Sequence, residues 1–478
     1  MQKLLVLTRH SFLTFFTSYL KDTSIVTLYL RLLAIVLTIN FTSLIFQFSD
    51  LALLDVPVNL NTVPLSLKWL NIFSYISYDY SLYVLVACLI LSILIFFLVF
   101  PFWALLFIAF LYSALIFRFP TFLSFQWDIL LIEVCFFSLF FISPKYFRYT
   151  KDIKYSFISF LPLMLLIIRL FVHSGLVKLL SNDIYWLGLS ALDIHLYSQP
   201  MPHFLSFFIH YWLIKLNLGS FFVYLVFLFE LVLPFGLLIP TYRKITAGLL
   251  IFFQLCILLT GNFGFFNFLV IVPLILFYRL SFDYDDDIQK YNFRFSFKTI
   301  AVGIVLCVIL INSSFKLFLF KSPVPIMSST FNSMMLFKSY GLFARMTTKK
   351  TKFNVFVSND LNQWFPIELN YFDPQGYPTL ELVQPYMPRI RWQLWFKFLM
   401  PNDALPSWYL SLIKYIASND FALNSIVKSK PSNNSYQYVK LCYQSIVFNL
   451  NKETRFRYPW MDQSFSTCDI FDTKKISF

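Results

Sequence analysis

The chain has 478 residues, of which 58% are hydrophobic, 21% aromatic and only 13% charged. Because soluble globular domains carry about 25% charged residues, this composition excludes an ordinary soluble protein and predicts an integral membrane protein. The net charge of +14 does not indicate a nucleic-acid partner, since much of the positive charge lies in short loops between apolar segments, as is typical of membrane topology.

Nine apolar segments approach the ~20 residues that cross ~30 Å of hydrocarbon. They span about 25–47, 82–99, 101–117, 128–142, 157–179, 220–239, 244–260, 264–280 and 298–319. Lys and Arg gather before the first segment and after the fourth and sixth. The positive-inside rule therefore predicts a cytoplasmic N-terminus and an exported C-terminus. The first segment is expected to be an uncleaved signal anchor, because the residues before it are too polar for a cleavable signal peptide.

Hydrophobicity falls after about residue 320, and this change predicts a domain boundary. We expect a polytopic α-helical transmembrane domain over 1–320, with an exported loop at 180–219, and an exported β-rich domain over 321–478. About 155 residues are enough for one folded domain.

The second domain contains three segments that alternate apolar and polar residues, at 353–357, 389–396 and 436–450. This period of two is typical of strands. Between the last two, Pro406 and Ser407 begin a segment with helical spacing. We interpret the domain as a β-sandwich-like module with an appended helix.

Two charged residues stand near the centres of apolar segments, Arg169 in the fifth and Glu230 in the sixth. A charge at the centre of a span costs ~2.5–3.5 kcal/mol on insertion scales, so we expect these two residues to pair. The pair is interpreted either as a structural clamp between two helices or as part of a proton or ligand path. Lys178, near a span end, is explained by snorkelling to the interface.

The chain lacks the common catalytic and metal-binding motifs. There is no GxSxG, no GxGxxG and no HExxH, and the spacing of the six cysteines and five histidines predicts no metal site. We therefore expect neither a metal nor a cofactor, and the chain is not predicted to be a lipase itself. Cys442 and Cys468 fall in the exported part, where a disulfide is chemically allowed, and their pairing stays open.

A polar and aromatic segment at 174–202 lies between two long apolar segments. Further motifs occur at 125–128 (FQWD), 230–235 (ELVLPF), 260–267 (TGNFGFFN) and 340–348 (YGLFARMTT). In this order, over roughly 120–460, they resemble the lipase maturation factors, membrane proteins of the secretory pathway that help secreted lipases reach their active fold. One departure is Phe263, because the family motif reads Gly-Asn-Tyr there.

The predicted topology places most of these motifs on the exported side, where we expect one binding surface. The candidate residues are Trp127, Asp128, Lys178, Asp183, Trp186, His195, Gln199, Pro200, Gly261, Asn262 and Asn267. The resemblance implies an integral membrane maturation factor, or chaperone, that assists the folding or assembly of secreted proteins such as lipases. Its partners would be a lipase-like client and membrane lipid. Its location would be the inner membrane of a bacterium or the endoplasmic reticulum membrane of a eukaryote.

The alternative is a membrane enzyme that acts on a protein or lipid at the exported face. The helical part resembles, more faintly, the membrane region of the vitamin K-dependent carboxylases, in which a lysine near the exported face acts on a bound lipid-like cofactor. That resemblance implies a catalytic group of Lys178, His195 and Asp128.

Overall fold

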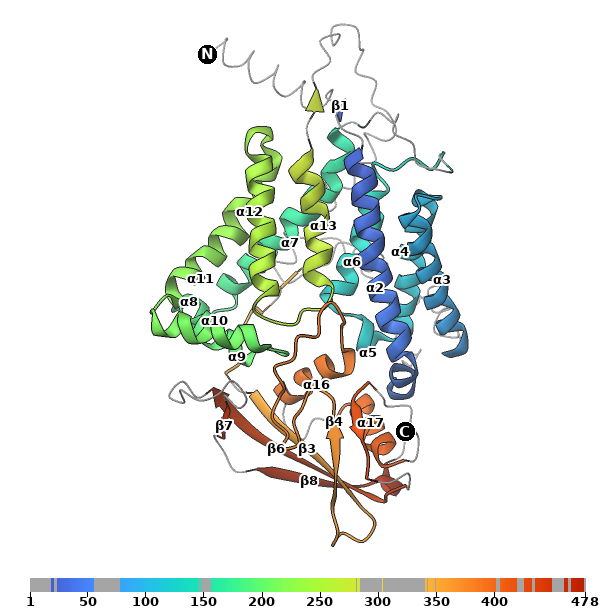
Figure 1. Ribbon diagram of the computed structural model, residues 1–478, viewed down its shortest axis with the longest axis vertical. Coiled ribbons are helices and arrows are strands. Elements are labelled where there is room, and N and C mark those ends of the chain that lie inside the picture. Colours follow the sequence, from blue (N-terminus) through green and yellow to red (C-terminus); the bar gives the residue numbers. More distant parts are fainter. Residues whose placement is uncertain are drawn as a thin grey trace.

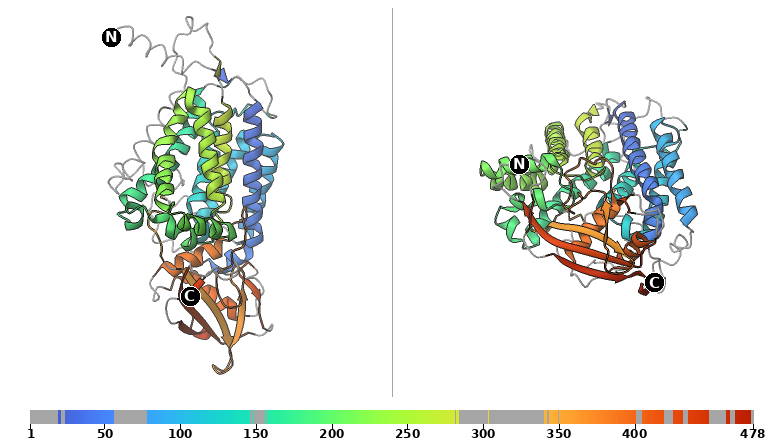
Figure 2. Two further views of the ribbon diagram at one scale, coloured as in Figure 1. Left: turned by 60° about the vertical axis from the view of Figure 1, so that its left-hand side comes forward. Right: turned by 60° about the horizontal axis from the view of Figure 1, so that its bottom comes forward.

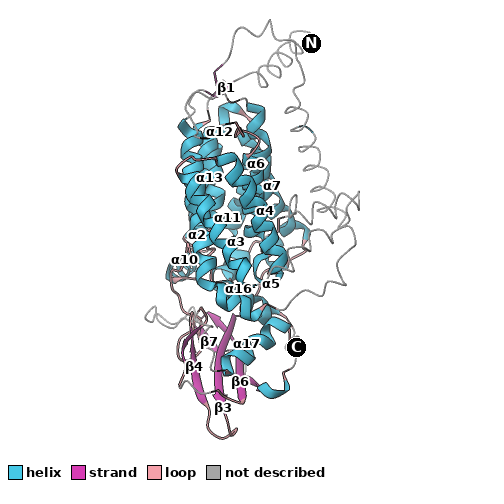
Figure 3. Ribbon diagram, turned by 90° about the vertical axis from the view of Figure 1, so that its right-hand side faces the viewer, coloured by secondary structure: helices cyan, strands magenta, loops and turns pink. Residues whose placement is uncertain are grey.

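A helical bundle carries a small β-sheet domain at one end in the computed structural model (Figure 1). The structure describes residues 19–20, 24–55, 78–145, 157–280, 282–283, 340–341, 343–348, 350–400, 405–418, 425–431, 435–448, 460–462 and 466–476, with the single residues 147, 155 and 303. The strands of the sheet lie together beyond the bundle (Figure 3).

The first half of the bundle consists of four longer helices and one short one. They are α2 (Ser24–Leu54), α3 (Tyr78–Phe96), α4 (Pro101–Arg118), α5 (Pro120–Leu123) and α6 (Gln126–Ser138). Pro101 and Pro120 each occupy the first turn of a helix, where the missing amide hydrogen leaves no bond unmade.

The second half begins with η4 (Phe157–Phe160) and α7 (Leu161–Leu180). It continues with α11 (Gly219–Phe227), η5 (Leu228–Val232), η6 (Leu233–Leu238), α12 (Pro240–Leu258) and α13 (Phe266–Arg279). The chain of α11 widens into a π-helical turn at η5 and tightens into a 3-10 turn at η6, beside Pro234. A proline cannot donate the regular helical hydrogen bond, and single π turns are frequent at functional sites.

Each of the first eight predicted apolar segments contains helix, and the ninth lies outside the described residues. In the described part, five helical stretches are long and apolar enough to cross a membrane by length and composition. They are Ser24–Leu54, Pro101–Arg118, Phe157–Leu180, Gly219–Leu238 and Pro240–Leu258. The number of crossings and their orientation stay predictions.

The predicted loop at 180–219 folds into three helices across the end of the bundle that faces the sheet domain (Figure 2). They are α8 (Ile184–Leu187), α9 (Ala191–Ser198) and α10 (Phe204–Lys215). His203 caps α10, since its ring accepts from the backbone N–H of Leu205 while Ser206 accepts from the N–H of His203.

The C-terminal domain is an antiparallel sheet with the strand order β5-β4-β3-β6-β7, and β8 also pairs with β6. The strands are β3 (Lys350–Ser358), β4 (Phe365–Leu369), β5 (Val427–Ser429), β6 (Tyr438–Phe448), β7 (Trp460–Asp462) and β8 (Thr467–Asp472). A separate two-stranded pair joins β1 (Tyr19–Leu20) to β2 (Phe282–Asp283). The strand predictions at 353–357 and 436–450 are confirmed.

Two helices of this domain, α16 (Arg389–Leu399) and α17 (Ser407–Ala417), complete it. In Figure 1, α16 lies between the sheet and the bundle. Phe353, Val355 and Val357 of β3 are buried together with residues of α16 and α17 in one continuous core that extends into the bundle. The helix predicted after Pro406 is confirmed as α17.

Two predictions for this domain are wrong. Residues 389–396 form the helix α16 rather than a strand. Residues on every side of this helix are buried, including Arg389, Arg391 and Trp395, so its sequence does not show the one-sided apolar stripe that marks a surface helix. The described strands also form one sheet covered by helices, not the two packed sheets of a sandwich.

A disulfide joins Cys442 of β6 to Cys468 of β8, which are direct partners in the register of the two strands. The pairing that the sequence left open is therefore present. The disulfide ties the outer strand β8 to the centre of the sheet.

The sheet domain is fastened to the bundle by a buried ion pair. Arg389, in the first turn of α16, donates to both carboxylate oxygens of Asp128 in α6, at 2.7 and 2.9 Å. Tyr112 of α4 donates to Asp128 at 2.5 Å, and the guanidinium also reaches the carbonyl of Phe122 at 2.8 Å. Both charged side chains are 0% exposed. Arg389 therefore connects the C-terminal domain with α4, α5 and α6.

A second contact lies beside this pair. The side chain of Gln47 in α2 donates to the carbonyl of Met387 at 2.9 Å and accepts from the backbone N–H of Arg389 at 2.9 Å. Gln47 is 0% exposed. Arg389, at the start of α16, is thus bound to the bundle through both its backbone N–H and its side chain.

We expect Arg389→Met to weaken the attachment of the sheet domain, because it leaves the buried Asp128 carboxylate without its partner. Removal of one member of a buried ion pair typically costs about 3–5 kcal/mol. The measurement is thermal unfolding of the detergent-solubilised protein together with limited proteolysis of its C-terminal domain.

The matched control is Lys428→Met, which breaks the exposed pair between Lys428 and Glu368, at 3.8 Å. Exposed pairs contribute about 0–1 kcal/mol, so this variant should unfold and be cleaved like the wild type. Equal behaviour of the two variants would show that Arg389 does not hold the domain.

Candidate functional site

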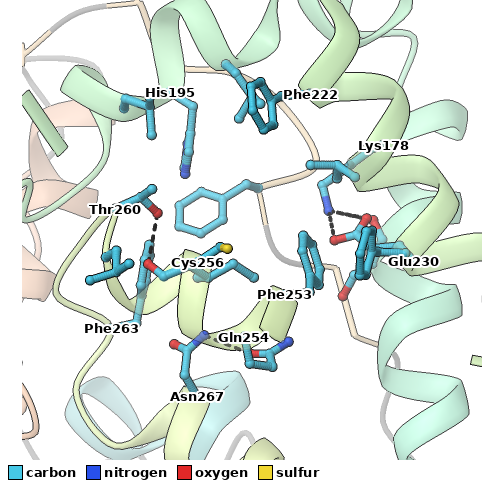
Figure 4. Close-up of a pocket in the computed structure, with 18 of the residues that line it drawn as sticks. Lys178, His195, Phe222, Glu230, Phe253, Gln254, Cys256, Thr260, Phe263 and Asn267 are labelled. Atoms are coloured by element: carbon cyan, nitrogen blue, oxygen red, sulfur yellow. Dashed lines mark hydrogen bonds and ion pairs between the residues drawn. The ribbon is translucent and has the colours of Figure 1, made fainter. Parts of the chain in front are cut away.

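The predicted motifs meet at the end of the bundle that carries the sheet domain (Figures 1 and 2). There they enclose a cavity of about 890 Å³. Its walls come from α6 to α13, from the segment 341–347 and from α16. The lining is mostly aromatic and aliphatic, with a few polar groups such as Lys178, His195 and Asn267 (Figure 4). Such a cavity is typical of a binding site for an apolar or amphipathic molecule.

An ion pair lies in the wall of the cavity between α7 and η5. The ammonium group of Lys178 donates to both carboxylate oxygens of Glu230, at 2.7 Å each, and it lies 5.2 Å from the ring centre of Trp186 (Figure 4). Gly175 permits this close approach, because a Cβ there would lie 2.7 Å from a methyl carbon of Leu231. The pair is nearly buried, with exposures of 6% and 9%.

The predicted pairing of Arg169 with Glu230 is wrong. Arg169 instead forms a buried ion pair with Glu133 of α6. Arg169 and Lys178 are nine positions apart in α7, which places them on opposite faces of the helix at 100° per residue. The face of Arg169 meets α6, and the face of Lys178 meets η5, so each of the two acids has its own cation.

The segment that follows residue 339 is anchored to α6. The hydroxyl of Tyr340 donates to Glu133 at 2.5 Å, and the ring of Tyr340 lies 5.4 Å from the guanidinium of Arg169. The backbone N–H of Gly341 donates to the side-chain oxygen of Gln126 at 3.1 Å. The motif at 340–348 therefore contacts the motif at 125–128.

The same segment is held to the loop of 180–219 by Asp183 and Trp186. Asp183 caps α8 by accepting from the backbone N–H groups of Tyr185 and Trp186 at 3.0 Å, and its other oxygen accepts from Met346 at 3.0 Å. The indole of Trp186 donates to the carbonyl of Phe343 at 3.0 Å. These bonds form one wall of the cavity.

Gln199 and Pro200 link the loop to α12 and to the sheet domain. The side-chain amide of Gln199 donates to the backbone carbonyl of Thr260. The backbone carbonyls of Gln199 and Pro200 both accept from the ammonium group of Lys350 in β3. Gly261 is required here, because a Cβ would overlap the side-chain oxygen of Gln199. Burial, with Arg391 nearby, lowers the pKa of Lys350 well below its usual value.

Asn262 joins the turn between α12 and α13 to an extended segment of the sheet domain. Its side chain donates to the carbonyls of Glu381, at 2.7 Å, and Met201, at 3.3 Å. It accepts from the backbone N–H groups of Val383, at 2.8 Å, and Gln384, at 3.2 Å. One amide side chain thus bonds four backbone groups.

His195 and Asn267 face the cavity from opposite walls (Figure 4). The ring of His195 packs against Phe343, with 4.5 Å between ring centres. Asn267 donates to the side-chain oxygen of Gln254 at 2.8 Å. Trp127 also lines the cavity, but Asp128 does not.

The three residues of the enzyme alternative are therefore not a single group. Lys178 and His195 share the cavity, whereas Asp128 is bound to Arg389 outside its lining. The candidate residues predicted from the sequence did not include Arg389, Glu133, Tyr340 and Lys350, although Tyr340 begins one of the motifs. Glu133 carried a signal, since it is an acid inside an apolar segment. Arg389 was not recognised because it lies in a segment interpreted as a strand.

In the described residues no cluster of three metal-ligating side chains occurs.

Models of known families match both the helical part and the C-terminal part of the chain. Residues 25–282 match the family model described as the lipase maturation factor transmembrane domain, which covers more than half of the chain. The chain belongs to the lipase maturation factor family. Residues 336–467 match the lipase maturation factor C-terminal domain. As a member of this family with helices suited to spanning a bilayer, the chain is an integral membrane protein.

Individual lipase maturation factors are distant relatives. The chain is 25% identical to lipase maturation factor 1 of Bos taurus over 305 residues, which cover 56% of this chain and 52% of that protein. It is 35% identical to lipase maturation factor 2 of Homo sapiens over 112 residues, or 22% of this chain and 15% of that protein. The match thus spans about half the length of the first relative. No solved structure matches the chain.

We expect Asn262→Asp to weaken the attachment of the sheet domain at the cavity. The substitution replaces the NH2 group, which donates to two backbone carbonyls, by a carboxylate oxygen that cannot donate to them. Leaving buried acceptors unpaired costs about 1–3 kcal/mol. The free energy of unfolding in detergent measures the loss. Asn362→Asp, at an exposed position, is the control, and equal stability of the two variants would contradict the role given to Asn262.

Acid should destabilise the protein through His195. Burial and the nearby Lys178 lower the pKa of His195 from 6.5 to about 4. Between these two pH values His195 is protonated in the unfolded chain and neutral in the folded chain. Its contribution to the free energy of unfolding is therefore complete above about pH 6.5 and is lost as the pH falls toward 4. His195→Gln should flatten this slope when the unfolding temperature is measured against pH. An unchanged slope in the variant would contradict the assignment.

Proposed function

We propose that this protein is an integral membrane maturation factor that assists the folding or assembly of secreted proteins such as lipases. The names of its relatives, lipase maturation factors 1 and 2, support this role. The observation that carries the proposal is the attachment of the loop at 180–219 and of the sheet domain to one end of the bundle, through Arg389, Lys350 and Asn262. A client would meet a preorganised surface there, and preorganisation lowers the entropic cost of binding.

The sheet domain offers a basic and aromatic surface for such a client. Residues 321–478 contain 18 basic and 10 acidic residues. Successive side chains of a strand point to opposite faces of the sheet. On the face opposite the buried one, the ammonium group of Lys440 lies 4.2 Å from the ring centre of Trp364 and 5.0 Å from that of Phe356. Lys352 lies 4.2 Å from the ring centre of Tyr377. We infer that acidic segments of the client bind this face.

The sheet domain is proposed to lie on the exported side. The positive loops of the sequence support this placement, and so does the disulfide between Cys442 and Cys468, because disulfides persist in oxidising compartments. The membrane would be the inner membrane in a bacterial cell or the endoplasmic reticulum membrane in a eukaryotic one.

The enzyme alternative has less support. A general base or nucleophile needs an available lone pair at the substrate. Lys178 donates to both oxygens of Glu230, and Asp128 is bound by Arg389 away from the cavity. These groups are committed to structure, which favours binding over catalysis.

The test is co-expression of a secreted lipase with this protein in cells that lack their own maturation factor. We expect the wild-type protein to raise the specific activity of the secreted lipase and to co-purify with it. The double variant Lys352→Glu and Lys440→Glu should lose both effects, since it reverses the charge of the proposed surface.

The control is Lys474→Glu with Lys475→Glu, which makes the same change of charge at exposed positions beyond β8. It should retain the effects of the wild type. If the wild-type protein neither binds the lipase nor changes its activity, the proposed function is wrong. If both double variants behave like the wild type, the client binds elsewhere.

A further inference from the structure

One charged side chain in the lining of the cavity has no partner. Lys178 and Glu230 neutralise each other through a bidentate ion pair. Arg345 also lines the cavity, and among the residues that the structure describes none forms a hydrogen bond or an ion pair with it. Arg345 is exposed, so a molecule bound at the cavity can reach it. Of the charged residues in the described lining, Arg345 is therefore the one left to attract an anion.

The backbone on both sides of Arg345 is fixed. The indole of Trp186 donates to the carbonyl of Phe343, and the N–H of Met346 donates to Asp183, each at 3.0 Å. Met346 is buried against residues of α8, α9 and α11. The carboxylate of Asp183 accepts from three backbone N–H groups and not from Arg345. An unneutralised guanidinium is thus positioned beside α11, and such preorganisation lowers the entropic cost of binding.

The cavity is open toward the side of the bundle that faces hydrocarbon in a membrane. Trp212, Phe222 and Phe252, from α10, α11 and α12, line the cavity and are 41%, 41% and 60% exposed. The candidate spans Gly219–Leu238 and Pro240–Leu258 are the least buried of the five, at 22% and 33%. Figure 1 shows α11 and α12 at the edge of the bundle. An acyl chain can therefore enter the cavity from the bilayer.

The interior of the cavity is neutral and mostly apolar. Asn267 donates to Gln254 at 2.8 Å, and the hydroxyls of Ser174 and Thr260 donate to backbone carbonyls at 2.8 Å. The pKa of His195 is lowered to about 4, so its ring is uncharged at pH 7. The other lining residues are chiefly aromatic and aliphatic. The interior therefore suits an uncharged chain, and a charged group of the same molecule is bound best at Arg345.

We propose that this cavity binds the acyl chain of an anionic amphiphile and that Arg345 binds its carboxylate or phosphate headgroup. Both headgroups offer two oxygens to the parallel N–H donors of a guanidinium. The chain lies among the apolar lining, on the side where α10, α11 and α12 face the bilayer. A volume of about 890 Å³ lies in the range of small-molecule sites, roughly 300–1,000 Å³. Neither Lys352 nor Lys440 of the client surface lines this cavity.

The test measures binding of photoreactive probes to the full chain in nanodiscs of zwitterionic phosphatidylcholine. Three probes share one alkyl chain that carries a diazirine, and they end in a carboxylate, a phosphate monoester or an alcohol. At about pH 9 a carboxylate is ionised even where the interface raises its pKa. We expect saturable labelling of α10, α11 and α12, mapped by mass spectrometry, to be stronger with at least one anionic probe than with the alcohol. The stronger anionic probe identifies the headgroup.

The variant is Arg345→Gln, which removes the charge at an exposed position. Its affinity for the anionic probe should fall by roughly two- to fivefold, the range of an exposed ion pair, and its affinity for the alcohol probe should not change. The matched control is Lys215→Gln, which removes an exposed cation of α10 that does not line the cavity, and it should bind every probe like the wild type. Arg345→Gln should unfold at the temperature of the wild type, because it breaks no bond among the described residues.

Equal labelling of the wild type by the alcohol and by both anionic probes would overturn the proposal. So would full retention of the anionic probe by Arg345→Gln, or an equal loss in Arg345→Gln and Lys215→Gln, which would show only a general attraction of anions to the interface. Inorganic phosphate at the concentration of the probe should not displace the alkyl phosphate, since the chain supplies much of the affinity, and displacement would contradict the account. None of these measurements depends on a client protein.

Discussion

The ion pair of Asp128 and Arg389 is the constraint on which the rest of the structure depends. It joins the first turn of α6 to the first turn of α16, and both charges are fully buried. Two charges without water are stable only when additional hydrogen bonds accompany the pair. Tyr112, Phe122 and Asn40 supply such bonds, while Nε of Arg389 has no partner among the described residues. The pair therefore specifies one position of the sheet domain on the bundle.

That position determines the shape of the cavity. With α16 held against α6, Trp392 and Trp395 come to lie beside Trp127, and the segment 340–346 runs between α6 and α8. The other buried ion pairs hold the helices of the walls in place, so that no wall belongs to a single segment of sequence. Binding of a client at the sheet is a proposal that uses one face of this assembly.

Most helices of the bundle could be predicted from the local sequence pattern. The partners of the buried charged residues at the site could not. Long apolar runs predict helices because a helix satisfies its own backbone in hydrocarbon, and eight segments contain helix. The partner of Arg169 depends on which neighbouring helix packs against its face of α7. The local sequence does not contain that information. Likewise α16 is buried on all sides, so its sequence lost the helical stripe, and Arg389 was not recognised as a bundle contact.

The most direct measurement is a double-mutant cycle at the central pair, with Asp128→Leu, Arg389→Met and the two combined. Each single variant strands one buried charge, whereas the double variant replaces the pair by apolar side chains. The account predicts that the double variant recovers stability, with a coupling free energy of about 2 kcal/mol or more. Losses that add within about 0.5 kcal/mol would show that the two residues do not meet, and the attachment of the sheet domain described above would then be wrong.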